Sequence, residues 1–280
     1  MEKSLKKYFL IFVGPTLLAF GVVFVIPFIL GVVLSFCRFT TITNASWVGF
    51  TNYTRAFSNP DFLRALTFSA GFTLLSVIII NIAAFSLALL LTRGLKSTNI
   101  FRTIIFMPNL IGGIVLGYIW NFIINGYLSI FGVTITVDPK YGLWGMVLLS
   151  SWQFIGYMMV IFIAGIHNIS EDILEAAKID GASPGKIITH ITIPLVMPSI
   201  TITMFMTISN SFKMFDQNLA LTAGAPSKQT AMVALDIYNT FYGRSGWEGV
   251  GQAKAFMFFL IVVIISLIQI SITRKKEVIH

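Results

Sequence analysis

Long apolar runs alternate with short polar segments along this chain. Six runs are long enough to cross the hydrocarbon core of a membrane, which is roughly 30 Å thick and takes about twenty residues of helix. None of them contains Asp, Glu, Lys or Arg, each of which costs about 2.5–3.5 kcal/mol at the centre of a span. The pattern therefore predicts an all-α integral membrane protein with six transmembrane helices. The six runs are Tyr8–Phe36, Ala65–Leu91, Ile104–Ile124, Leu143–Ile166, Pro194–Ser211 and Ala255–Thr273.

The positive charges predict an orientation for these spans. With six crossings, both termini lie on the same side of the membrane. Of the 19 Lys and Arg residues, the larger share falls in the termini and in the loops on that side, which favours a cytoplasmic location for both termini. Lys254 stands directly before the last run, so we expect the sixth span to begin after it. We expect a single transmembrane domain over residues 1–280.

Composition narrows the class of protein further. Hydrophobic residues make up 56% of the chain and charged residues 11%, a balance that belongs in a bilayer. The single cysteine, Cys37, excludes a disulfide framework, and the three histidines show no ligand spacing, so no metal site is predicted. The net charge of +8 could suggest nucleic acid, but no basic helix is interleaved with aromatic residues. Cations at span ends explain the charge better, and we expect no nucleic-acid partner.

The most informative polar segment is SEDILEAAKIDGASPGKIITHITIP, residues 170–194. Ser170 is a good N-cap, and the two acids behind it suit the positive end of a helix dipole. Gly181 supplies the left-handed residue that ends this helix. Ser183 and Pro184 indicate the cap and the first residue of a second helix. The segment therefore predicts two short helices with a bend between them. A generic amphipathic connector between spans is the plainest alternative.

The order of residues in this segment resembles the EAA loop of binding-protein-dependent ABC importer permeases. Glu-Ala-Ala is followed by glycine and then, ten or more residues later, by Ile-x-Ile-Pro. In that family the loop is a cytoplasmic coupling helix that docks in a cleft of the ATPase. The resemblance implies an ATPase-coupling role for Glu175, Ala176, Ala177, Asp180, Gly181, Ile191 and Pro194.

Two further stretches resemble carbohydrate importers of this family. VGFTNYTRAF, residues 48–57, is similar to the "VGL-NY" segment of permeases of the maltose and glycerol-phosphate type. SFKMFDQNLALTAGAP, residues 211–226, is similar to their "FKVFDQ... TGGGP" signature in the subunit with a short N-terminus, and departs from it at Ala223 and Ala225. The resemblance implies an ABC type I importer permease fold. It also implies an extracellular loop over residues 215–252 that contacts a solute-binding protein, with a helix on the membrane surface.

The sequence carries no catalytic set. There is no phosphate-binding glycine loop with its lysine, no His and Glu metal spacing and no nucleophile elbow. We therefore expect no enzymatic activity and no bound cofactor, with ATP and Mg²⁺ held by partner subunits. The resemblance implies an importer of sugars, in particular oligosaccharides, in the bacterial cytoplasmic membrane. Its implied partners are a second homologous permease in a heterodimer, two ATPase subunits and an extracellular solute-binding protein.

The substrate path is also implied by the resemblance. Amides inside a span face protein or water rather than lipid, and a sugar site combines amides and hydroxyls with flat aromatic faces. We consider Asn109, Gln153 and Asn210 the best candidates for pairing sugar hydroxyls. The alternative is that such side chains only pack and anchor. By position relative to the EAA loop, the lining residues are Asn109, Gly113, Ser150, Gln153, Phe154, Thr207, Asn210, Ser211 and Met214.

Other interpretations of the function remain open from the sequence. The importer could carry another neutral solute, whereas the neutral lining argues against a peptide, a polyamine or phosphate. A secondary transporter driven by an ion gradient should show ionisable residues within its spans or an inverted repeat, and the sequence shows neither. A structural or signalling membrane protein would not explain the coupling pattern.

Overall fold

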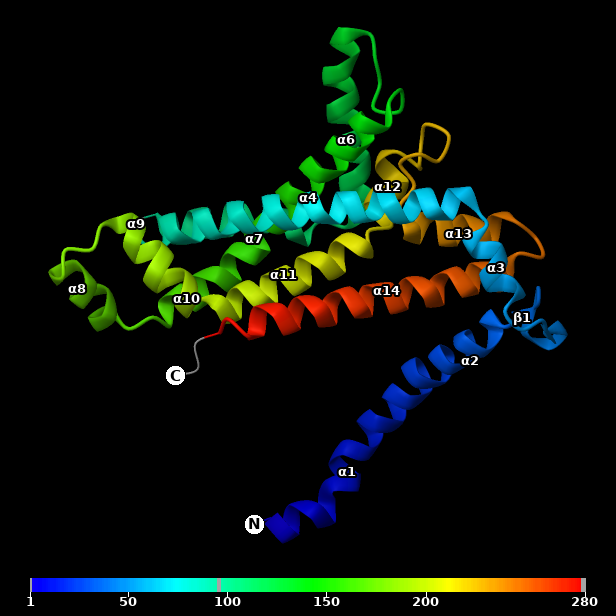
Figure 1. Ribbon diagram of the computed structural model, residues 1–280, viewed down its shortest axis with the longest axis horizontal. Coiled ribbons are helices and arrows are strands. Elements are labelled where there is room, and N and C mark those ends of the chain that lie inside the picture. Colours follow the sequence, from blue (N-terminus) through cyan, green and yellow to red (C-terminus); the bar gives the residue numbers. More distant parts are fainter. Residues whose placement is uncertain (1, 95–96, 278–280) are drawn as a thin grey trace. The chain divides into compact units, whose positions relative to one another are not determined.

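The computed structural model describes residues 2–94 and 97–277, and its regular structure is helical apart from two short strands (Figure 1). Within those ranges, five helices are long and apolar enough to span a membrane, and a bent pair of helices makes up to six. The prediction of an all-α membrane protein is confirmed. The spans are Ile11–Ser35, Pro60–Leu91, Gly113–Phe131, Pro139–His167, Glu248–Arg274 and the pair Pro184–Leu195 with Met197–Phe212.

The bounds of the elements are as follows. The span helices are α1 (Glu2–Phe20), a π-helix (Gly21–Val25) and α2 (Ile26–Ser35), α4 (Pro60–Leu91), α6 (Gly113–Leu128), α7 (Pro139–His167), α11 (Met197–Phe212) and α14 (Glu248–Arg274). The shorter helices are α3 (Thr51–Phe57), α5 (Thr98–Phe106), α8 (Glu171–Ile179), α9 (Pro184–Ile187), a π-helix (Ile188–Thr192), α10 (Ile193–Leu195), α12 (Asp216–Leu221) and α13 (Val233–Gly243). Single 3₁₀ turns cover Ile42–Asn44, Met107–Leu110 and Ser129–Phe131, and strands β1 (Cys37–Arg38) and β2 (Ser46–Trp47) pair antiparallel.

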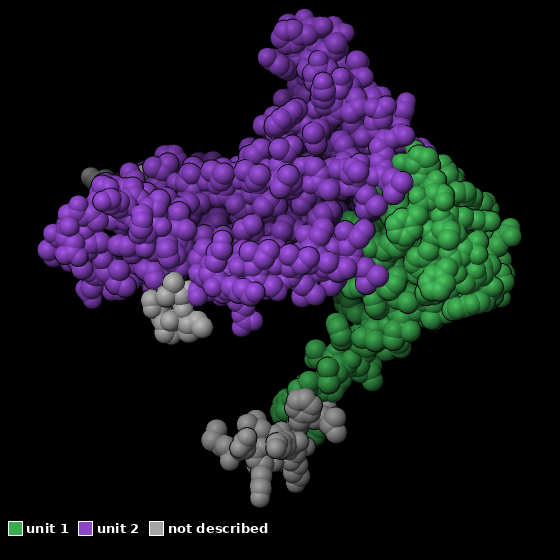
Figure 2. Space-filling model, in the orientation of Figure 1, with its two compact units in different colours: residues 1–62, 237–259 green, residues 63–236, 260–280 purple. Residues whose placement is uncertain are grey.

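The chain divides into two compact units, coloured separately in Figure 2. Unit 1 comprises Met1–Phe62 and Ile237–Phe259. Inside it, the buried amide of Asn52 in α3 donates to the carbonyl oxygens of Ser35 (2.9 Å) and Cys37 (2.8 Å). The first bond satisfies a carbonyl that α2 leaves open at its end, and the second reaches strand β1. They fix α3 against the turn that follows the first span.

Unit 2 comprises Leu63–Asp236 and Leu260–His280 and holds the main hydrophobic core. In Figure 1, α4, α7 and α11 run beside one another, while α6 projects away from them. Small and large side chains alternate where α4 meets α7, as close helix packing in membranes requires. This contact buries Ile80, Ala84, Ala88, Met158, Met159 and Phe162.

Two predicted spans are not single straight helices. The third, predicted over 104–124, straddles a break: α5 ends at Phe106, a 3₁₀ turn follows, and α6 begins at Gly113 after an extended Gly112. The helical span is Gly113–Phe131 instead. Pro108 lies in that turn, where its missing N–H and its ring both work against a continuous α-helix.

The fifth span was predicted over Pro194–Ser211, and in the structure this stretch belongs to a bent pair of helices, Pro184–Leu195 and Met197–Phe212. The helical segment Pro184–Leu195 and α11 are bent by 71°. Val196, between them, has φ −93° and ψ 10°, which is outside the helical range. Pro198 stands two residues later, and its ring would clash with the carbonyl four residues before it in a continuous helix. The helix therefore turns sharply where the sequence shows only an apolar run.

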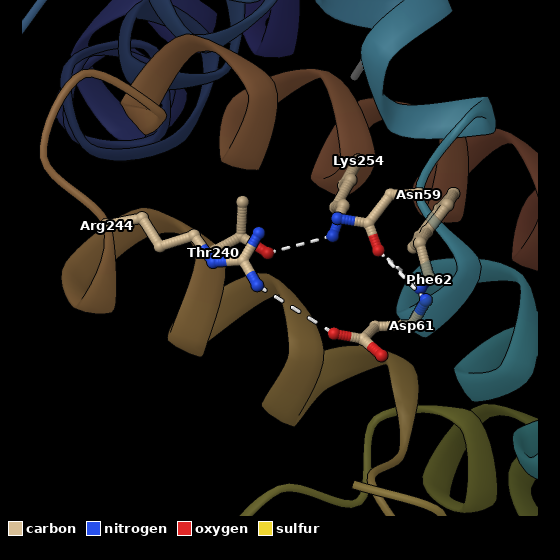
Figure 3. A network of polar contacts seen from close by, with 6 residues as sticks. All are labelled: Asn59, Asp61, Phe62, Thr240, Arg244 and Lys254. Atoms are coloured by element: carbon tan, nitrogen blue, oxygen red, sulfur yellow. Dashed lines mark hydrogen bonds and ion pairs between the residues drawn. The ribbon is translucent and has the colours of Figure 1, made fainter.

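The sixth helix begins before Lys254, so the expectation that it starts after that residue is wrong. The Lys254 side chain is fully buried within unit 1. Its Nζ donates to Thr240 Oγ1 at 2.8 Å and lies 5.1 Å from the centre of the Phe62 ring (Figure 3). A hydroxyl and an aromatic face both stabilise an ammonium group. The helix can therefore continue through a charged residue.

A second polar contact in unit 1 lies at the start of α4 (Figure 3). Asn59 caps this helix, because its Oδ1 accepts from the backbone N–H groups of Asp61 (2.9 Å) and Phe62 (3.3 Å). Asp61 also pairs with Arg244 at 3.8 Å. Both side chains are partly exposed, so this ion pair contributes little to stability. The cap is the contact that defines where α4 begins.

Candidate functional site

The predicted pair of helices with a glycine bend is present in the segment 170–194. Helix α8 ends before Gly181, which has φ +74°, a conformation that favours glycine. The N–H of Gly181 donates to Lys178 O at 3.1 Å, and the N–H of Ala182 donates to Ala177 O at 3.0 Å. These two bonds form a Schellman motif, which closes the helix and fixes the direction in which the chain leaves it.

The N-terminal caps of α8 and α9 are only partly as predicted. Ser170 and Ser183 occupy the cap positions, and Pro184 is the first residue of α9. Neither serine side chain accepts a hydrogen bond from its helix. The Ser170 hydroxyl instead donates to a carboxylate oxygen of Asp172 at 3.5 Å. The first turn of α8 therefore keeps backbone donors that no side-chain cap satisfies.

The candidate coupling residues fall into two groups. Glu175, Ala176, Asp180 and Gly181 are exposed around α8, whereas Ala177 is buried behind them. Ile179, which sequence reasoning did not single out, is 85% exposed on the same helix. Ile191 and Pro194 lie further along, half-buried in the π-helix and α10. The helix α8 thus presents a small, mixed apolar and acidic surface to its surroundings.

The break between α5 and α6 brings several candidate path residues together. The amide of Gln217 in α12 donates to Gln153 Oε1 in α7 at 2.9 Å, and Gln153 Nε2 donates to Ile111 O at 3.4 Å. A Cβ added at Gly113 would stand 2.9 Å from Gln217 Cδ, so only glycine allows this approach. Gln217 was not among the predicted path residues. Its signal was the polar pair Asp216 and Gln217 directly after the fifth span.

Other candidate path residues are held by their own chain. Ser150 is fully buried, and its hydroxyl donates to Val147 O at 3.1 Å. Thr207 is buried, donates to Thr203 O at 2.7 Å and accepts from Asn81 Nδ2 at 3.3 Å. These hydroxyls mainly satisfy helix backbone, as serine and threonine often do within spans.

The remaining path candidates differ in burial. Ser211 and Met214 are buried, and Met214 belongs to a hydrophobic cluster. Phe154 is half-buried and packs against that cluster and the one between α4 and α7. Asn109 and Asn210 are half-buried. The structure therefore places Gly113 and Gln153 next to Gln217. The Asn109 and Asn210 side chains remain partly exposed.

A buried asparagine that sequence reasoning missed organises the loop after α12. Asn218 is fully buried, and its Nδ2 donates to Thr230 O at 2.8 Å and to Thr222 Oγ1 at 3.1 Å. Its Oδ1 accepts from Met232 N at 2.9 Å. Ala223, one of the two positions that depart from the signature noted in the sequence, has φ 49°. The turn therefore keeps a left-handed residue at this position despite the Cβ.

The described residues contain no group of three or more His, Cys, Asp or Glu side chains arranged to hold a metal ion. Cys37 is a buried thiol. The polar groups around Gln153 and Gln217 are mainly amides and backbone carbonyls, and the Asp216 side chain lies beside them next to Gly113. The amides can both donate to and accept from an uncharged hydrogen-bonding ligand.

Comparison with known proteins gives a consistent picture. Residues 81–277 match the family model described as "Binding-protein-dependent transport system inner membrane component". The "Probable starch degradation products transport system permease protein AmyD" of Thermoanaerobacterium thermosulfurigenes is 41% identical over 97% of this chain and 95% of that protein. The "Multiple sugar-binding transport system permease protein MsmF" of Streptococcus mutans is 29% identical over 99% of each chain.

A solved structure shares the fold. A chain of a bacterial alginate ABC transporter, in complex with an alginate pentasaccharide-bound periplasmic protein, superposes with a TM-score of 0.82 at 20% identity. The match covers 98% of this chain and 97% of that chain. At this identity, the likeness concerns the fold of the chain.

Proposed function

Because the chain belongs to the family of binding-protein-dependent transport system inner membrane components, we propose that it is a permease subunit of an ATP-driven importer for sugars, in particular oligosaccharides. It is a multi-pass membrane protein with a role in transport. The observation that carries the sugar assignment is the 41% identity, over almost the full length of both chains, to a permease named for starch degradation products.

The chemistry around the break between α5 and α6 supports a neutral, hydroxyl-rich cargo. Gln153 and Gln217 present amide groups joined by a 2.9 Å hydrogen bond, and an amide can donate to one sugar hydroxyl while accepting from another. Asn109 and Asn210 add two half-buried amides. These side chains, with Gly113, Ser150, Phe154, Thr207, Ser211 and Met214, form our candidate path.

The loop 170–194 is our candidate link to an energy source. The chain itself has no ATPase motif, so ATP would be hydrolysed by two partner subunits that hold ATP and Mg²⁺. The exposed surface of α8, with Glu175, Ala176 and Ile179, has the size and mixed chemistry of a surface that docks into a cleft of another protein. This assignment places the loop 170–194 and both termini in the cytoplasm, and the loop 215–252 outside.

Two further partners complete the proposed assembly. The most apolar window of the first span has no buried residue, and such a surface suits contact with lipid and with a second homologous permease. The alginate transporter was solved with a periplasmic protein that carries the sugar. By analogy, a solute-binding protein would deliver the cargo to the outer face of this chain.

The proposed mechanism is alternating access. Closure of the ATPase dimer on ATP would move α8, and the Schellman motif makes α8 and α9 move as one piece. The motion passes through the π-helix and α10 into α11, which carries Thr207, Asn210 and Ser211. A shift at the loop would therefore reach the candidate path through α10 and the 71° bend at Val196 into α11. Hydrolysis would return the assembly to its inward-facing state.

Alanine at Asn109, Gln153 and Asn210 together tests the path. We expect lower sugar uptake in proteoliposomes, with the ATPase subunits still copurifying. Asn168→Ala, an exposed amide beyond the end of α7, is the matched control. Unchanged uptake by the triple variant would remove the proposed path. Mass spectrometry of the solute bound to the copurified binding protein tests the cargo, and a peptide or a phosphate compound there would refute the sugar assignment.

A further inference from the structure

A large cavity lies behind the loop 170–194. Its volume is about 750 Å³, within the range of about 300–1,000 Å³ typical of ligand pockets. Helices α8 and α9 form one side of it, and the ends of α4 and α7 form the other. Both α4 and α7 are candidate spans, ending at Leu91 and His167. The cavity therefore lies at the depth where two spans leave the membrane, which is the level of the lipid headgroups.

The lining of this cavity combines two kinds of chemistry. Basic groups come from three separate elements: Arg93 after α4, His167 at the end of α7 and Lys178 in α8. Glu171 is the acid that faces them. Within residues 2–94 and 97–277, these three basic side chains have no hydrogen-bond or ion-pair partner. The apolar wall consists of Leu89, Ile166, Ile169, Leu174, Ile187 and Ile188.

Helix ends alone do not explain this arrangement. Basic side chains near the C-terminus of a helix complement its dipole, which accounts for His167 at the end of α7 and Arg93 just beyond α4. Such a role needs neither an enclosed space nor apolar walls. Lys178 reaches the same cavity from the loop, on the other side. The convergence of these groups on one apolar cavity indicates an amphiphilic ligand with a negative charge.

We propose that this cavity binds a phospholipid with an anionic headgroup. The phosphate oxygens would accept hydrogen bonds from Arg93 and Lys178, and the acyl chains would lie along the leucine and isoleucine wall. Basic pockets between spans at the cytoplasmic face bind anionic lipids in this manner. A soluble anion would gain nothing from the apolar wall. A zwitterionic lipid would bring a positive group into a site where the two fixed positive charges of Arg93 and Lys178 outnumber the one acid, Glu171.

The bound lipid would also have a mechanical effect. It would fill the space between α8 and the ends of α4 and α7. It would thereby hold the loop 170–194 at a fixed angle to the membrane. This consequence rests on the proposed role of the loop in coupling to an ATPase. The binding itself does not, and it is measured without transport.

The first experiment removes the charges. The protein is purified from membranes with its copurifying subunits, placed in nanodiscs of equal phosphatidylglycerol and phosphatidylcholine, and analysed by native mass spectrometry for retained lipid. We expect wild type to retain phosphatidylglycerol selectively, and Arg93→Gln and Lys178→Gln each to weaken that retention about fivefold, since one basic residue near the surface contributes about 1 kcal/mol. Lys186→Gln, an exposed lysine in α9 outside the cavity lining, should leave it unchanged.

The second experiment separates a lipid from a free anion. Ala182→Phe narrows the cavity without changing its charge, and should lower the retention of phosphatidylglycerol. Millimolar inorganic phosphate should not displace the lipid, and displacement would show a site for free anions. Equal phosphatidylglycerol retention in wild type and in a variant that combines Arg93→Gln with Lys178→Gln would overturn the proposal. If retention follows the prediction but transport does not change in either variant, the lipid site stands and the proposed mechanical effect of the lipid on the loop is wrong.

Discussion

Helix α7 comes close to the backbone of α5 at Gly156. A Cβ added at this glycine would stand 2.5 Å from the carbonyl carbon of Ile105 and 2.8 Å from Phe106 Cα. Both atoms belong to the backbone of α5, so no side-chain rotation can relieve the contact. Gly156→Ala must therefore push α5 away from α7.

The cost of this substitution can be worked out from two opposing terms. Overpacking a buried contact costs typically about 1–3 kcal/mol, and contact with unyielding backbone places this case at the upper end. Alanine regains up to about 1 kcal/mol through its higher helix propensity. The net destabilisation is about 2 kcal/mol, which corresponds to a decrease in Tm of about 4–8 °C for a chain somewhat shorter than this one.

Thermal unfolding of the detergent-purified protein measures this effect. Gly71→Ala in α4 is the matched control, because a Cβ there has nothing within 4 Å. We expect the control to unfold at or slightly above the wild-type temperature. If Gly156→Ala unfolded at the wild-type temperature, α5 would not lie against α7 at backbone distance, and the placement of the break that follows α5 would be wrong.

Two further substitutions test the loop after α7 and the loop after α12. Gly181→Ala forces a Cβ into the left-handed conformation at a cost of about 1–2 kcal/mol, and we expect less sugar taken up per ATP hydrolysed in proteoliposomes. Gly185→Ala, in the same loop with open space around it, should behave as wild type, and equal ratios for the two variants would contradict the prediction. Asn218→Ala leaves Thr230 O and Met232 N without their buried partner, which should cost about 2–6 kcal/mol at about 1–3 kcal/mol for each group. A melting temperature equal to that of Asn168→Ala would refute the role of Asn218.

The straight spans were predictable from sequence, because the ends of each apolar run lie within a few residues of the ends of the helix. The second run was predicted over Ala65–Leu91 and the helix is Pro60–Leu91; the fourth was predicted over Leu143–Ile166 and the helix is Pro139–His167. The left-handed residue at Gly181 was predictable as well, since local chemistry alone decides it. In each of these cases, the residues that determine the local structure lie within one short stretch of the chain.

The broken spans could not be placed from sequence. Hydropathy records whether a residue prefers lipid, and it carries no information on the direction of the backbone. A proline inside an apolar run fits either a kink or a full break, and packing decides between them. At Pro108 the outcome is a 3₁₀ turn, and near Pro198 it is a bend of 71°.

The candidate path likewise includes residues that were predictable from the sequence and residues that were not. Gln153 was predictable as an amide inside a span, which rarely faces lipid. Its partner Gln217 lies 64 residues further along the chain, and no local pattern indicates that the two meet. Lys254 was misjudged because sequence methods treat a lysine as the end of a span. Its burial depends on Thr240 and Phe62, which only the folded unit brings together.

Because of the 71° bend at Val196, the segment Pro184–Leu195 is a lever arm set at an angle to α11. At 1.5 Å per residue, the twelve residues from 184 to 195 form an arm of about 18 Å. A turn of about 10° at Val196 would sweep the far end of that arm through about 3 Å. A displacement of that size at the loop could thus be converted into rotation of α11 without compressing or unwinding either helix.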